Sequence, residues 1–124
     1  MMQSPSVEYI EDIATYSPPL HNGTLNRRLV PAALEAGFEV IHGTLSPGGS
    51  AERHFHETEW QVILMLDGEG RLQLGDAPEV IVSAGAVIRI PPGVPHVFRV
   101  VGDTPARVLV IYSPPLGADG FRSA

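Results

Sequence analysis

Glycine and proline most constrain the fold of this chain, because they divide its apolar residues into short segments. The 124 residues include 13 glycines and 12 prolines, and the apolar runs between them are rich in valine and isoleucine. Short runs of this composition, bounded by turn residues, are typical of β-strands. A chain of this length forms one domain that can bury a real core. The pattern therefore predicts a single all-β barrel or sandwich.

Seven segments after Gly37 carry the strand pattern, each bounded by glycine, proline or aspartate. They predict a β meander that folds over itself, with strands at residues 38–45, 60–66, 70–74, 80–82, 86–90, 96–101 and 107–112. The earlier residues form a lead-in with a candidate strand at 7–10 and turns at 17–20 and 22–23. Residues 31–36 predict at most a short helical turn.

Charge and cysteine content exclude several classes of protein. The formal net charge of −6 argues against nucleic-acid binding, which needs lysine and arginine to neutralise phosphates. The absence of cysteine excludes disulfides and thiolate ligands and favours a reducing cytoplasm. No apolar run approaches the roughly 20 residues of a membrane helix, and the N-terminus lacks the pattern of a signal peptide. We expect a cytoplasmic protein that acts on a small molecule and binds neither nucleic acid nor membrane.

Three histidines and one glutamine have the spacing of metal ligands. His54 and His56 are one residue apart, so on a strand they project to the same side and form a chelating pair. Gln61 follows in the next segment, and His96 can supply a third imidazole from another strand of a closed barrel. Such a nitrogen-rich pocket suits a transition metal better than calcium or magnesium. One divalent ion per chain is therefore expected, with Zn, Fe, Mn, Ni, Co and Cu as candidates.

The first of these segments resembles a signature motif of the cupin family. Gly48 opens it, and His54 and His56 follow at the family spacing. Six residues separate Gln61 from the closing Gly68, so the glutamine occupies the place of the usual ligand glutamate. The glutamine is the one departure from this motif.

The second segment resembles the other cupin motif. Gly85, Pro91, Gly93 and His96 occupy its positions, and Val100 replaces the final asparagine. Two long motifs in the right order are a specific signal. The chain is similar to small single-domain, RmlC-like, metal-binding cupins.

This resemblance implies a double-stranded β-helix, the jelly-roll barrel of the cupins. We expect the barrel over residues 38–112, preceded by an N-terminal arm and lead-in strands at 1–37 that belong to the same domain. Residues 113–124 are expected to form a C-terminal tail that packs loosely on the surface.

The ligand set implied by the resemblance is His54, His56, Gln61 and His96. Glu57 and Glu59 compete with Gln61 as the oxygen ligand if the turn after His56 is arranged differently.

The proton-transfer group is open among Glu59, His42 and Tyr112, in that order of preference. A pocket-lining residue within reach of the substrate is required for this role. His21 is expected to be an ordinary surface or hydrogen-bonded histidine.

The neutral donor set bears on the reaction. Three imidazoles and an amide leave the charge of a divalent ion uncompensated, which makes the centre a stronger Lewis acid and attracts anionic substrates. The set also departs from the two histidines and one carboxylate of common iron oxygenases. Among cupins it is similar to the sites of enzymes that open unsaturated uronate rings and of certain polyketide cyclases. An isomerase, cyclase or lyase acting without net redox change on a small oxygen-rich substrate is the expected function.

Two alternatives stay open. Other three-histidine cupins activate oxygen, so a dioxygenase that uses ferrous iron is the rival enzyme. A non-catalytic barrel that binds a small molecule is the rival outside enzymes.

Strand parity predicts a homodimer. If Gln61 points into the barrel, alternation along its strand leaves apolar side chains on both faces. A strand buried on both faces must be covered by another element, and a second subunit or the N-terminal arm can provide that cover. The inward set would be Gln61, Ile63 and Met65, and the outward set Val62, Leu64 and Leu66.

Overall fold

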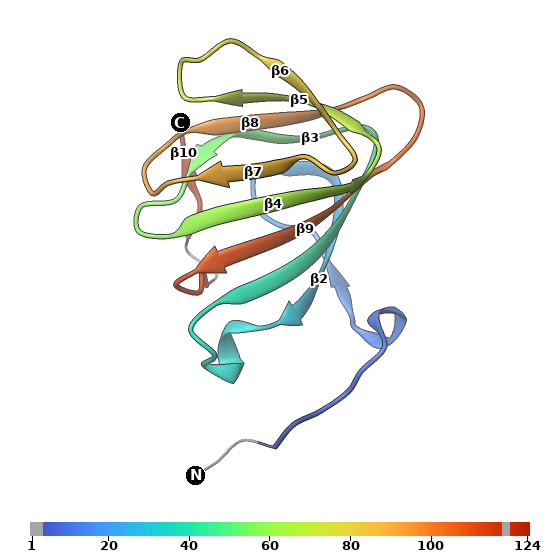
Figure 1. Ribbon diagram of the computed structural model, residues 1–124, viewed down its shortest axis with the longest axis vertical. Coiled ribbons are helices and arrows are strands. Elements are labelled where there is room, and N and C mark those ends of the chain that lie inside the picture. Colours follow the sequence, from blue (N-terminus) through green and yellow to red (C-terminus); the bar gives the residue numbers. More distant parts are fainter. Residues whose placement is uncertain (1–3, 118–119) are drawn as a thin grey trace.

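In the computed structural model, which describes residues 4–117 and 120–124, the chain is a curled antiparallel β-sheet (Figure 1). The prediction of an all-β jelly-roll barrel is confirmed. The strands are β1 (Thr15–Tyr16), β2 (His21–Val30), β3 (Glu39–Phe55), β4 (Trp60–Asp67), β5 (Glu69–Leu74), β6 (Val80–Ser83), β7 (Val87–Ile90), β8 (His96–Val101), β9 (Ala106–Ser113) and β10 (Arg122–Ser123). Two 3₁₀ turns, η1 (Ile10–Asp12) and η2 (Ala32–Leu34), are the helical segments of this part of the chain, and neither could cross a membrane.

The long strand β3 joins the two halves of the curl. Its first part, residues 39–45, pairs with β9 and β2. Its last part, residues 50–54, pairs with β8, after which β5 and β6 complete that half. The other half continues from β9 through β4 to β7. Because one strand belongs to both halves, the inner faces of the two halves enclose a common core.

Period-two alternation builds this core. Along β9, Ala106, Val108, Val110 and Tyr112 are buried, and the residues between them are half-buried or exposed. Met65 on β4 is the most deeply buried large side chain of that strand, at 1% exposure. Apolar side chains from β3, β5, β7 and β8 complete the cluster. Non-directional burial of these side chains stabilises the curl.

The expected strands correspond to β3 through β9, and the expected turn at 31–36 contains η2. Strand β3 runs ten residues further than expected, so that it contains His54 and ends directly before His56. The reason is long-range pairing, because residues 50–54 find partners on β8 and on β2 that local pattern does not reveal.

The lead-in differs from its prediction. Val7 and Tyr9 lie outside any strand and are largely exposed, and Ile10 begins η1. The expected turn at 22–23 instead lies inside β2, where the register with β3 shifts between Asn22 and Thr24. Gly23 has φ +72° there, so glycine permits a bulge rather than a turn.

The C-terminal tail is not loosely packed, which corrects the expectation. Arg122 and Ser123 form β10 and pair with Phe55 and His54 at the end of β3. Upstream, the Glu39 side chain accepts hydrogen bonds from the backbone N–H groups of Leu116 and Gly117. The tail is therefore bonded at both of its described ends to the strand that carries the histidine pair.

Candidate metal centre

Three imidazoles meet where β3 ends and β8 begins. His54 lies near the end of β3 and His56 directly follows this strand, and His54 is directly paired with His96 across the ladder to β8. The ring centroids of His54 and His96 are 4.3 Å apart, and that of His56 lies 5.0 Å from the first and 5.4 Å from the second. Ligand atoms of all three rings lie within 4.8 Å of one another. The geometry is that of a cluster able to hold one metal ion.

Backbone carbonyls hold the same nitrogen of each ring. The Nδ1 atoms of His54, His56 and His96 lie 2.6, 2.7 and 3.0 Å from the carbonyl oxygens of Glu52, Gly120 and Val94. A carbonyl only accepts, so each Nδ1 carries the proton and each Nε2 keeps its lone pair. Metal-binding histidines are oriented by this kind of contact.

Gln61 presents an oxygen beside these rings. Its Nε2 donates to the Tyr112 hydroxyl at 3.2 Å, which leaves Oε1 as the opposite end of the amide. Oε1, together with Nε2 of His56 and of His96, is buried without a hydrogen-bond partner in the described structure. Buried polar atoms without partners are uncommon, and three of them beside one another fit a set of metal donors. The residues present therefore suit a transition metal bound by nitrogen and one neutral oxygen.

Burial keeps the imidazoles neutral. Desolvation lowers the pKa of His54 and of His56, and it lowers the pKa of His96 to about 3, with the neighbouring His54 adding to the last shift. Each of these side chains is only 2–3% exposed. A neutral imidazole is the form that binds a metal.

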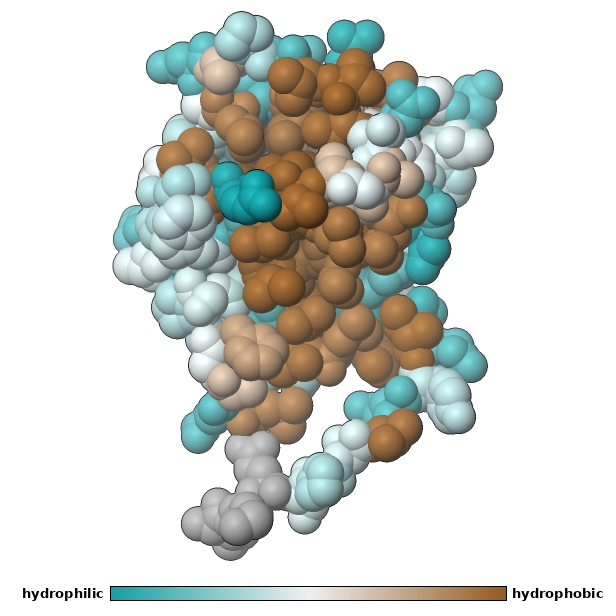
Figure 2. Space-filling model, in the orientation of Figure 1, coloured by the Kyte–Doolittle hydropathy of each residue, from teal (hydrophilic) through white to brown (hydrophobic). Residues whose placement is uncertain are grey.

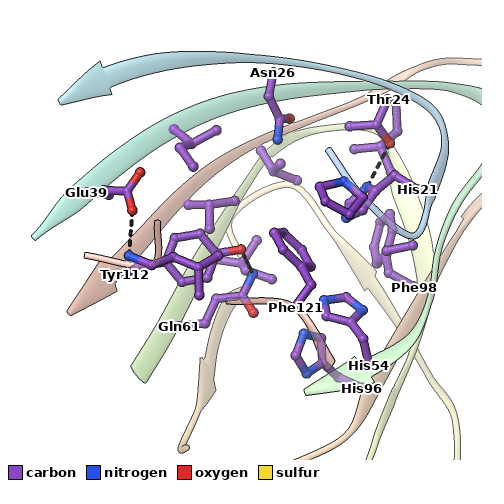
Figure 3. A pocket seen from close by; sticks show the side chains of 18 of the residues that line it. His21, Thr24, Asn26, Glu39, His54, Gln61, His96, Phe98, Tyr112 and Phe121 are labelled. Atoms are coloured by element: carbon purple, nitrogen blue, oxygen red, sulfur yellow. Dashed lines mark hydrogen bonds between the residues drawn. The ribbon is translucent and has the colours of Figure 1, made fainter. Parts of the chain in front are cut away.

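A cavity of about 100 Å³ opens from the cluster into the barrel. Figure 3 shows His54 and His96 on one side of it, Glu39 on the opposite side, and Tyr112 and Phe121 between them. The walls are largely aliphatic and aromatic, from Ile41, Leu45, Ile63, Leu72, Phe98, Val108 and Val110.

Two lining residues were not expected from the sequence. His21 at the start of β2 has its ring 6.1 Å from that of His54, and its Nδ1 lies 3.0 Å from Thr24 Oγ1. Burial lowers its pKa to about 4, with the neighbouring His54 and His56 acting in the same direction. Phe121 packs 5.2 Å from His54 and 5.0 Å from His56. Both come from segments whose positions depend on pairing with β3, and no local motif indicates them.

The three candidates for proton transfer lie in different places. Tyr112 lines the cavity, and burial raises the pKa of its hydroxyl. His42 is also buried, but it lies outside the cavity, where its Nε2 accepts a hydrogen bond from Arg107 at 3.2 Å. Glu59 accepts a hydrogen bond from Thr58 and borders a separate outer hollow that tail residues also line.

Glu57, a rival for the oxygen ligand, is engaged elsewhere. Its carboxylate forms an ion pair with Arg122 of β10 at 3.0 Å. It borders the same outer hollow as Glu59 and not the cavity. Gln61 is thus the side-chain oxygen that the structure brings to the imidazoles.

Comparisons with known proteins agree on one family of folds. The family model for the cupin domain matches residues 41–112. No curated protein sequence matches the chain.

Solved structures extend this likeness beyond the matched segment. The polyketide cyclase RemF from Streptomyces resistomycificus is 27% identical, with a TM-score of 0.79 over 100% of this chain and 86% of that one. A protein described as a predicted oxalate decarboxylase from Thermotoga maritima is 23% identical, with a TM-score of 0.79 over 88% of this chain and 99% of that one. Ectoine synthase from P. lautus is 15% identical, with a TM-score of 0.79 over 97% of this chain and 90% of that one. The last two likenesses concern the fold alone.

Proposed function

The chain belongs to the cupin family, and on this premise we propose that it is a metal-dependent enzyme that catalyses a redox-neutral isomerisation, cyclisation or lyase reaction. His54, His56, His96 and Gln61 would hold one divalent transition metal. The observation that carries the proposal is the set of buried, unpartnered donor atoms, Nε2 of His56 and His96 and Oε1 of Gln61, at the end of an apolar cavity.

The neutral donor set favours redox-neutral chemistry. When bound, a divalent ion with these ligands supplies Lewis acidity toward a substrate oxygen, undiminished by a ligand carboxylate. The likeness to a polyketide cyclase over the whole chain supports the same class of reaction. Fold alone constrains chemistry weakly, so the donor set carries more of the argument.

Tyr112 would act on the substrate as a proton-bearing group. Its oxygen accepts the hydrogen bond from Gln61, which leaves its own O–H free to donate toward the cavity. Burial raises its pKa, so the phenol keeps its proton at neutral pH. A fixed donor of this kind stabilises negative charge that develops on a substrate oxygen. It would also orient the amide of Gln61.

The cavity walls would exclude water from the reacting groups. Phe121 covers the rings of His54 and His56, and aliphatic side chains line the remainder. A dry site strengthens every electrostatic contact inside it.

Metal content and oxygen dependence test this function. Protein loaded with zinc and protein loaded with ferrous iron would be assayed against poly-β-keto model compounds under argon and in air. We expect turnover with zinc under argon, and we expect His96→Ala to abolish both zinc retention and turnover. Turnover only with iron and stoichiometric oxygen uptake would establish a dioxygenase, and tight binding without turnover across all conditions would establish a binding protein.

We further propose that the protein is a homodimer. Figure 2 shows a broad apolar area on the face formed by β4, β7 and β9. Cross-strand registers line up partly exposed apolar side chains on that outer face: Val40, Ile111 and Val62 in one row, and Leu109, Leu64 and Val87 in the next. Apolar areas of this extent on an isolated chain mark interaction sites.

A second copy is the occupant that fits this face. The N-terminal arm leaves the barrel (Figure 1) with Val7 at 89% and Tyr9 at 70% exposure. The chain thus carries an uncovered apolar sheet face and, in the N-terminal arm, apolar side chains that pack on no surface of their own chain. Two copies would bury both features at once.

A further inference from the structure

The inner face of β2 carries a row of polar side chains that line the cavity. His21, Thr24, Asn26 and Arg28 all line the cavity from this strand. The first two lie beside the histidine cluster, where His21 contacts His54. Asn26 and Arg28 lie toward the other end of the strand. The candidate metal centre involves His21 and Thr24, but it gives no role to Asn26 and Arg28.

The two ends of the row are far apart. His21 pairs with Ala51 and Arg28 pairs with Ile41 on β3. Seven residues of strand span roughly 20 Å. A ligand that reaches both the metal centre and Arg28 must therefore be elongated. A single sugar ring at the metal would leave Arg28 without contact.

Arg28 carries a charge that no carboxylate of the described residues neutralises by an ion pair. The four ion pairs found in residues 4–117 and 120–124 all involve other arginines. Its guanidinium instead stacks on the Tyr16 ring at 3.6 Å from the centroid. Stacking fixes the plane of the guanidinium and leaves its N–H edge available for a planar oxyanion.

The neighbouring polar groups are arranged around this guanidinium. Glu39 lines the same end of the cavity, but its Oε1 accepts the N–H groups of Leu116 and Gly117. The Asn26 side chain lies close enough to Tyr16 to influence the pKa of its hydroxyl. Its Oδ1 lies 2.7 Å from the point where a Cβ on Gly43 would stand. Glycine at position 43 thus makes room for Asn26 inside the barrel.

We propose that Arg28, stacked on Tyr16 and flanked by Asn26, is a second substrate subsite that binds an oxyanion at the end of the cavity remote from the metal centre. The substrate class is an elongated molecule with a flat, mainly apolar body, an oxygen function at the metal end and an anionic oxygen at the Arg28 end. This inference rests on the proposed function, because the first oxygen is assigned to the metal centre.

Pairs of aromatic acids test the subsite directly. The probes are biphenyl-4-carboxylate with biphenyl-4,4′-dicarboxylate, and p-terphenyl-4-carboxylate with the longer p-terphenyl-4,4″-dicarboxylate. Side chains that reach into the cavity from both ends make the gap to be bridged shorter than the roughly 20 Å of strand. Calorimetric titration of zinc-loaded protein measures how much the second carboxylate strengthens binding. We expect at least one dicarboxylate to bind about 10-fold more tightly than its monocarboxylate, since an arginine–carboxylate contact has that magnitude.

Matched variants identify the residue responsible. Arg28→Gln should remove the gain, and Arg28→Lys should keep only part of it, because lysine retains the charge but not the planar fork. Arg27→Gln is the control, since it removes the same charge from the same strand at a residue that does not line the cavity. In Arg27→Gln, the second carboxylate should strengthen binding as much as it does in the unchanged protein.

The outcomes separate the subsite from the metal centre. The subsite would be overturned if the second carboxylate strengthened binding in neither pair of probes. It would also be overturned if the stronger binding survived Arg28→Gln, or if Arg27→Gln lost as much of it as Arg28→Gln. Zinc content is measured on every sample. Failure of the unchanged protein to retain zinc would overturn the proposed metal function, whereas zinc retention without a carboxylate gain would overturn the subsite alone.

Discussion

The Nδ1 atom of His56 lies 2.7 Å from the carbonyl oxygen of Gly120, a residue 64 positions later in the chain. The same tail places Phe121 against the rings of His54 and His56. The C-terminal tail is therefore part of the support of the candidate metal centre.

Removal of residues 120–124 should weaken zinc binding by about 10- to 100-fold, the usual effect of losing a contact that orients a ligand. Competition with a chromophoric chelator measures the affinity. Removal of Ala124 alone, which keeps Gly120 and β10, is the control and should leave the affinity unchanged. Equal affinities in the two truncated proteins would show that the tail does not orient His56.

Gln61 should supply the oxygen ligand. Gln61→Ala is expected to lower zinc retention after dialysis, because it deletes the buried Oε1 beside the imidazoles. Glu59→Ala should leave retention unchanged, since Glu59 borders the outer hollow. The reverse pattern would assign the oxygen ligand to Glu59.

Tyr112→Phe should weaken zinc binding less than Gln61→Ala does. The change removes the hydroxyl that accepts from Gln61 Nε2, so the amide loses its orientation but keeps its oxygen. Burial elsewhere in the barrel is unchanged because the ring remains. A zinc affinity in Tyr112→Phe as low as that in Gln61→Ala would mean that the hydroxyl does more than position the amide.

The metal-free protein should lose stability as the pH falls below about 6.5. Burial lowers the pKa of His21 to about 4 and of His96 to about 3 in the folded chain, whereas the ordinary histidine value is 6.5. The unfolded chain therefore binds protons first, so stability is complete above 6.5 and declines toward the folded-state values. Calorimetry should show Tm lower by roughly 5 to 10 °C at pH 5 than at pH 7.5. A Tm that is constant over this interval would contradict the burial of neutral imidazoles.

Leu64→Glu or Leu109→Glu on the outer face should convert the proposed dimer into monomers, because each places a charge in the apolar rows. Light scattering after size-exclusion chromatography measures the mass. Ile81→Glu is the matched control, since Ile81 is 53% exposed on β6, outside those rows. A monomeric unchanged protein, or dimers that persist in both outer-face variants, would exclude this interface.

Local sequence determined the strands β4 to β9, the first part of β3, and the fact that His54 and His56 lie on one side of the chain. The shared side follows from period two, since His54 and His56 are two positions apart and must share a face. The position of His96 followed from a motif that resembles the cupins, and the register between His54 and His96 agrees with it.

Tertiary structure decided which face of the early part of β3 lines the cavity. His42 and Ile41 are neighbours on opposite faces, and both faces carry apolar residues, so local pattern does not distinguish the inner one. Pairing with β2 and β9 turns Ile41 inward and His42 toward Arg107. His42 thus does not line the cavity, whereas His21 of β2 lies beside the candidate metal centre.

Tertiary structure also decided the places of β2 and of the tail. Their residues lack alternation strong enough to predict strands, and each becomes extended only because β3 offers unpaired backbone groups to it. The hydrogen bond between His56 and Gly120 joins residues that are far apart in the sequence, so no local pattern predicts it. The sequence by itself thus predicted the candidate donor residues, whereas the walls of the cavity and the contacts that orient these residues required long-range pairing.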